Sequence, residues 1–146
     1  MEPIHSYFAL LKRLNTLTEH QVNRAIQDTG LTMSQGALMF QLIQTPEGFL
    51  SMKQAEQIMK LSQPVTAGLV KRLEEKGYLE SFGSEKDKRI KLIRATELGK
   101  ERLQIARSTM ISLEQEIFQI LTQEEIHQLG ASLLKLRDTM EDKWRE

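Results

Sequence analysis

The central part of the sequence, residues 51–95, reads SMKQAEQIMKLSQPVTAGLVKRLEEKGYLESFGSEKDKRIKLIRA. Ser51 is followed three residues later by a glutamine, which is the pattern of a capping box at the start of a helix. Ser62 precedes a second apolar run with a proline in its first turn, and Gly77 supplies the left-handed residue that commonly ends a helix. These signals predict a short helix, a tight turn, and a second helix from Ser62 to about Lys76.

The second of these helices is expected to have one buried face and one exposed face. The residues at helical spacing that we expect to be buried are Thr66, Leu69, Val70 and Leu73. The opposite face is polar or small, and it consists of Gln63, Pro64, Ala67, Gly68 and Lys71. This face is therefore available to a partner.

A β-hairpin is predicted to follow the helix pair. Residues 78–82 and 89–95 have the β-branched and aromatic content of short strands, and residues 83–88 between them have turn composition with two lysines. Helix, tight turn, helix and hairpin is the order of a winged helix-turn-helix, in which the second helix enters the major groove of DNA and the hairpin reaches the flanking backbone or minor groove. The predicted fold is thus mainly α with a two-stranded β-wing.

Long helices are expected on both sides of this central region. The first has apolar residues three or four positions apart up to Gly30, namely Ile4, Tyr7, Phe8, Leu11, Leu14, Thr18, Val22 and Ile26. A capping box at Thr32 starts the next helix. Thr96 and Thr122 are expected to cap two more helices, which we expect to pair antiparallel. The apolar stripes of these last two helices are Leu103, Ala106, Met110, Leu113, Ile117 and Ile120, and then Ile126, Leu129, Leu133, Leu136 and Met140.

The apolar surface of three long terminal helices exceeds what one small helix-turn-helix core can cover, so self-association is expected. We therefore assign residues 1–30 and 100–146 to a helical dimerisation region. Residues 31–99 form the predicted winged helix-turn-helix DNA-binding region.

Composition limits the class of protein. The chain has 146 residues, 40% of them hydrophobic, which suits one globular domain. Its net charge is zero, but residues 51–100 hold 11 basic and 7 acidic residues, a balance of +4. There is no cysteine, and no apolar run approaches the length of a membrane span. We expect a soluble cytoplasmic protein without cofactor, metal or membrane partner.

Several runs of residues resemble MarR-type bacterial transcriptional regulators. They are Leu61-Ser62, LVKRLEEKGYL at residues 69–79, Asp87-Lys88-Arg89 and ATELG at residues 95–99. The outer segments fit in order and length, so the resemblance covers essentially the whole chain. It implies a homodimer with interlocking terminal helices and two winged domains on a pseudo-palindromic operator of double-stranded DNA. It also implies a repressor, often released by a small-molecule effector.

The resemblance implies a DNA-contacting role for particular residues. At the start of the second helix, Ser62, Gln63 and Pro64 would approach base edges and phosphates. Arg89 would insert into a minor groove, whose negative potential attracts a guanidinium, with Asp87 as the acidic partner that orients it. The remaining candidates for contacts to DNA are Ser34, Ala67, Gly68, Lys71, Arg72, which would face the DNA backbone, and the wing lysines Lys86, Lys88 and Lys91, which would contact phosphates.

Three features depart from the family pattern. Ala67 and Gly68 stand where the family commonly has a hydroxyl and a long polar side chain, although an alanine methyl can pack on a thymine methyl and glycine lets the backbone come close. Ser81 and Phe82 occupy a stretch of the first wing strand that often carries arginine. Glu56 replaces a residue that is often small.

Two other classes of function compete with DNA binding. An enzyme or metal site would rest on His5, His20 and His127, but these lie far apart and no nucleophile elbow, phosphate-binding glycine loop or His-Glu-x-x-His run accompanies them. We therefore expect that the protein is not an enzyme. The alternative function is a winged-helix module that binds protein without DNA, which would have a hydrophobic or acidic recognition face.

Four apolar residues lie near the expected junction of the dimerisation and DNA-binding regions, namely Tyr7, Met33, Phe40 and Met110. They would either line an effector pocket or form plain core.

Overall fold

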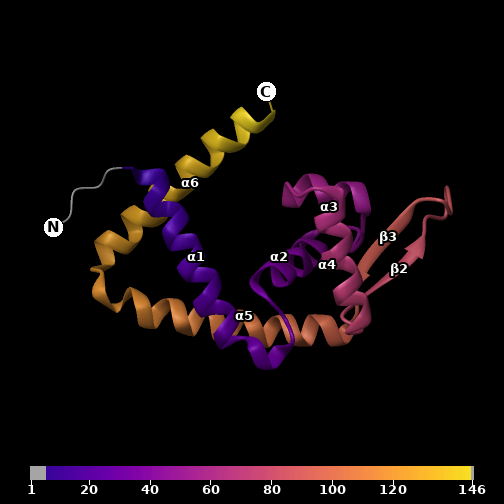
Figure 1. Ribbon diagram of the computed structural model, residues 1–146, viewed down its shortest axis with the longest axis horizontal. Helices are drawn as coiled ribbons and strands as arrows, with labels where there is room; N and C mark the ends of the chain where they lie inside the picture. Colours follow the sequence, from indigo (N-terminus) through magenta and orange to yellow (C-terminus); the bar gives the residue numbers. More distant parts are fainter. Residues whose placement is uncertain (1–5, 146) are drawn as a thin grey trace. The chain divides into compact units, whose positions relative to one another are not determined.

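The structure is a computed structural model that describes residues 6–145 (Figure 1). Ile4 and His5 lie outside the described residues. The helices are α1 (Tyr7–Ala25), α2 (Met33–Gln44), α3 (Met52–Met59), α4 (Gln63–Glu75), α5 (Glu97–Ile117) and α6 (Gln123–Arg145), with short 3-10 turns at Gln27–Thr29 and Phe118–Ile120. The strands are β1 (Leu50–Ser51), β2 (Leu79–Gly83) and β3 (Lys91–Ala95). The chain divides into two compact units between Met110 and Ile111.

Side-chain caps start the helices where the sequence predicts them. Thr32 Oγ1 accepts from the Gln35 backbone N at 3.2 Å, and Gln35 Oε1 accepts in return from the Thr32 backbone N at 3.3 Å. The capping box at Ser51 is also present, and Ser62 Oγ accepts from the Val65 backbone N at 3.4 Å. These predictions are confirmed. The first helix ends earlier than expected, at Ala25, because a 3-10 turn intervenes before Gly30.

The first unit is built around the α2–α4 helices and a small sheet. The buried core includes Leu38, Met39, Leu42, Leu73 and Ile93. All four residues expected on the inner face of α4 are buried, at 7% exposure or less. Figure 1 shows α4 beside the β2–β3 hairpin, so the helix and the wing form one continuous part of this unit.

The sheet has three antiparallel strands in the order β1-β3-β2. The two-residue strand β1 was not predicted, and it pairs Leu50 with Ile93. A strand this short has no alternation that a sequence pattern can reveal. Arg89 and Ile90 were expected in the second wing strand but lie in the turn, because the Ile90 backbone N donates to Asp87 O and its carbonyl accepts from the Ser84 backbone N, both at 3.0 Å.

The junction between α4, β2 and α5 is tightly packed. Thr96 Oγ1 accepts from the Gly99 backbone N at 3.1 Å, which confirms the predicted cap, and donates to the Gly77 carbonyl at 2.6 Å. A Cβ on Gly99 would lie 2.0 Å from the Tyr78 carbonyl oxygen, so only glycine fits there. Tyr78 Oη in turn donates to the Thr29 carbonyl at 2.7 Å, which ties this junction to the turn before α2.

The second unit contains the end of α5 and helix α6. Thr122 and Glu125 form the predicted cap at the start of α6. No described residue of α6 is buried. The antiparallel pairing of the last two helices stays a prediction. The apolar side chains that remain exposed on this helix are Leu129, Leu133, Leu134, Leu136, Met140 and Trp144. Across the part of the chain that the structure describes, no helix is long and apolar enough to span a membrane.

Candidate nucleic-acid interface

The outer face of α4 does not pack against the core. Gln63 and Pro64 are exposed in its first turn, Ala67 and Gly68 are half-buried, and Lys71 is exposed one turn further along. A Cβ on Gly68 would lie 3.6 Å from Arg72 Nη1, so the exposed Arg72 side chain lies back along the helix over this glycine. The face therefore presents amide, small and cationic groups in sequence along one helix.

The loop at the tip of the wing holds a bidentate ion pair. Arg89 donates from Nε to Asp87 Oδ1 and from Nη2 to Asp87 Oδ2, both at 3.0 Å, and its backbone N donates to Oδ1 at 3.0 Å. These side-chain hydrogen bonds lower the pKa of Asp87 and raise that of Arg89. The Arg89 side chain is nevertheless 91% exposed. The expected pairing is present, and it fixes a guanidinium that faces solvent; its contact with DNA stays a prediction.

The other cations of the wing differ in their surroundings. Lys86 and Lys88 are exposed and form no ion pair with any residue between positions 6 and 144. Arg94 lies 4.4 Å from the centre of the Phe82 ring and bonds to Glu80 at 2.6 Å. Lys91 Nζ lies 3.1 Å from Glu74 Oε1 at the end of α4. Lys91 is therefore already paired within the protein.

Glu74 has no role predicted from the sequence, although the structure places it between the helix and the wing. The only available signal was an acidic side chain at the end of a helix that faces a basic hairpin. Ser34, another predicted DNA contact, is exposed in the first turn of α2. The predicted site residues on α4 and on the wing loop thus belong to one unit, and their role in binding stays a prediction.

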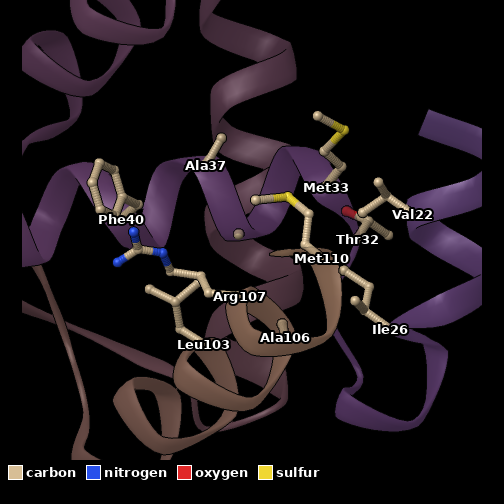
Figure 2. Close-up of a pocket in the computed structure, with 11 residues that line it drawn as sticks. Val22, Ile26, Thr32, Met33, Ala37, Phe40, Leu103, Ala106, Arg107 and Met110 are labelled. Atoms are coloured by element: carbon tan, nitrogen blue, oxygen red, sulfur yellow. The ribbon is translucent and has the colours of Figure 1, made fainter. Parts of the chain in front are cut away.

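A pocket of about 250 Å³ lies within the first unit, between α1, α2 and α5 (Figure 2). Its lining is apolar apart from two side chains, those of Thr32 and Arg107. Three of the four residues named as pocket candidates line it, namely Met33, Phe40 and Met110. The fourth, Tyr7, does not line the pocket and is 72% exposed at the start of α1. The pocket brings together residues that are far apart in sequence, from Val22 to Met110.

Arg107 supplies the cationic group of this pocket. Figure 2 shows its guanidinium beside the Phe40 ring, and its Cζ lies 4.5 Å from the ring centre. This distance is that of a cation–π interaction, which holds the guanidinium without neutralising its charge. Among the described residues no carboxylate is paired with Arg107. The pocket therefore suits a small apolar molecule, and an anionic group on it would meet a positive charge.

The histidines that the structure describes lie on separate helices. His20 and His127 lie on α1 and α6, and His5 lies outside the described residues. In residues 6–145, no three histidine, aspartate or glutamate side chains are placed to bind one metal ion.

Comparisons with known proteins point in one direction. The MarR family is matched over residues 29–90. The HTH-type transcriptional regulator YybA of Bacillus subtilis, itself named as uncharacterized, is 28% identical over 122 residues, which are 84% of this chain and 80% of the relative. The structure of S. aureus MepR in complex with DNA has a TM-score of 0.80 at 20% identity and covers 93% of this chain and 99% of that one. Wild-type MarR from E. coli, in its apo form, also gives 0.80, at 19% identity, with 92% and 98% covered.

Proposed function

Residues 29–90 match the MarR family, and from this premise we propose that the chain is a dimeric, DNA-binding transcriptional repressor of that family. The observation that carries the proposal is that one unit has both an exposed Arg89 on the wing, held in orientation by Asp87, and a polar outer face on α4. A helix of this kind fits the major groove, which is about 12 Å wide. The wing then lies over the adjacent minor groove, where a narrow groove attracts guanidinium.

The two parts of this surface are expected to do different things. Gln63 has an amide that can read base edges. The cationic side chains suited to phosphates are Lys71, Arg72, Lys86 and Lys88. Arg89 is suited to the minor groove because Asp87 holds its planar guanidinium in one orientation. Base contacts would determine sequence preference, and phosphate contacts would determine the register on the duplex.

Dimerisation is supported by apolar side chains that the single chain leaves exposed. They lie on α1, where Phe8 is 72% and Leu14 is 49% exposed, and on α6, where Leu133 is 44% exposed. Burial of these side chains in a second copy would remove a large apolar area from water. A two-fold dimer places its two recognition helices on half-sites about 10 base pairs apart.

We further propose that the pocket between α1, α2 and α5 binds the effector. Its size and apolar lining favour a small molecule, and the charge of Arg107 favours an acidic one. Because Thr32 both lines the pocket and caps α2, an occupant would contact the start of a helix in the DNA-binding region.

The proposal is tested by selecting bound duplexes from a random DNA pool at fixed salt. We expect a selected site with an internal dyad, bound by a dimer. Selection of no preferred duplex, or binding as a folded monomer at micromolar concentration, would contradict the proposal and favour the protein-binding alternative.

Wing variants then test the role of Arg89. Arg89→Ala should cost about 1–3 kcal/mol per half-site and relax preference at flanking positions. Lys88→Ala should weaken all sequences about equally and lower the salt slope by about one unit per lost contact. Asp87→Ala should also weaken binding, although it removes a negative charge; tighter binding of this variant than of the wild type would refute the oriented wing.

A further inference from the structure

The carboxylate of Glu74 joins three elements of the DNA-binding surface. Glu74 lies in the last turn of α4 and accepts a hydrogen bond from the hydroxyl of Ser81 on β2. Its Oε1 also lies 3.1 Å from Lys91 Nζ on β3. One side chain of the recognition helix therefore contacts both strands of the wing.

These contacts lie at the base of the wing loop. Lys91 is the first residue of β3 and pairs with Gly83, the last residue of β2. The loop that carries the Asp87–Arg89 pair, residues 84–90, runs between these two positions. Fixing Lys91 thus fixes the chain two residues after Arg89.

The surroundings of Glu74 favour a held, ionised carboxylate. Its side chain is 33% exposed, and the hydrogen bond from Ser81, followed by the contact with Lys91, lowers its pKa. Glu75, the next residue, is exposed and forms no hydrogen bond or ion pair with any side chain that the structure describes. The two glutamates carry the same charge on the same helix, but only Glu74 bridges to the wing.

We propose that Glu74 is a positioning residue that sets where the wing arginine enters DNA relative to the bases under α4. The role rests on the proposed function, because it acts through Arg89 on the operator. A wing that is held in place before binding loses less conformational freedom when the complex with DNA forms. The affinity for DNA, and the spacing between the contacts of α4 and of Arg89, therefore both depend on the bridge that Glu74 makes to the wing. The Lys91 charge serves this bridge and not a phosphate.

The test compares Glu74→Ala with the matched control Glu75→Ala on the selected operator. Each variant removes one negative charge near DNA, and electrostatics alone makes both bind more tightly. We expect Glu75→Ala to bind as well as the wild type or better, and Glu74→Ala to bind about tenfold more weakly. Equal effects of the two variants would overturn the proposal. Glu74→Gln, which keeps an acceptor for Ser81, should fall between the wild type and Glu74→Ala.

A double-mutant cycle with Arg89→Ala separates positioning from direct contact. In that background we expect Glu74→Ala to change affinity by less than about twofold, because the group it positions is absent. A full tenfold loss would show that Glu74 acts independently of the wing arginine and would overturn the inference.

A measurement without DNA distinguishes failure of this inference from failure of the proposed function. In the free protein, Glu74→Ala should lower the NMR order parameters of the backbone amides of residues 84–90, while Glu75→Ala should leave them unchanged. Unchanged order parameters in both variants would overturn the positioning role even if the wild type binds its operator. Lower order parameters in Glu74→Ala, with no operator binding by the wild type, would refute the proposed function and, with it, the role of Glu74 on DNA.

Discussion

Replacement of Gly30 by alanine should destabilise the fold through two separable effects. Gly30 has a φ of +76°, where a residue with a Cβ is less stable than glycine by about 1 kcal/mol. The added Cβ would also lie 2.7 Å from Tyr78 Oη, and the Tyr78 ring is only 7% exposed, so it has little room to move. We expect the overlap to add about 1–2 kcal/mol, for a total loss of about 2–3 kcal/mol.

Tyr78→Phe removes the atom responsible for the overlap. On its own this change should cost about 1–3 kcal/mol, because the hydroxyl donates to the Thr29 carbonyl at 2.7 Å in a buried position. In the phenylalanine background, however, the nearest atoms to an alanine Cβ at Gly30 are ring carbons at 3.5 and 3.6 Å, which is ordinary contact. Gly30→Ala should then cost only the backbone term of about 1 kcal/mol.

The assay is urea unfolding followed by circular dichroism at one fixed protomer concentration, since self-association makes stability depend on concentration. We expect a coupling free energy of about 1–2 kcal/mol in favour of the double variant. Gly48→Ala is the control: its φ is +77° and nothing lies within 4 Å of the added Cβ, so its cost should add to that of Tyr78→Phe. Additive costs for Gly30→Ala and Tyr78→Phe would refute the reasoning.

Three further predictions concern the pocket, the terminal helix and pH. Arg107→Met should weaken binding of aromatic carboxylates about tenfold in calorimetric titration and leave neutral aromatic compounds unaffected; equal losses would argue against a charge-based preference. Leu133→Glu with Leu136→Glu should give monomers by sedimentation, whereas Gln128→Glu on the same helix should not. The pKa of Glu74 is lowered in the folded protein, so its stabilisation is present at neutral pH and is lost as the pH falls through that lowered value. The free energy of unfolding of Glu74→Gln should therefore fall less steeply than that of the wild type on acidification, and parallel profiles would contradict this.

Local features of the fold were predictable because their causes are local. The caps at Thr32, Ser51 and Ser62 each depend on two residues three positions apart, and both residues are visible in the sequence. The buried face of α4 follows from helical spacing in the same way, since its periodic apolar positions have to meet the core. Such features need no knowledge of the rest of the chain.

Features that depend on distant segments were not predictable in the same way. The pocket needs Val22, Phe40 and Arg107 to converge from three helices, and no spacing rule links those positions. The ion pair of Lys91 was not predictable for the same reason, because its partner Glu74 lies 17 residues earlier and the contact depends on how the wing packs on α4. The exposed apolar side chains of α6 are a similar case. Their helical spacing in the sequence predicts an apolar face, but it does not say what covers that face.

The separation of the two faces of α4 has a consequence for how operator preference can diverge among descendants of this protein. Thr66 and Leu73 are buried, and changes there act on folding, whereas Gln63 and Lys71 contact solvent. Substitutions on the outer face therefore leave the stability margin nearly intact, since surface changes usually shift unfolding free energy by less than about 0.5 kcal/mol. With the proposed role of this face in DNA recognition, the two copies that follow a gene duplication can acquire different target sequences by single steps that each leave a folded protein.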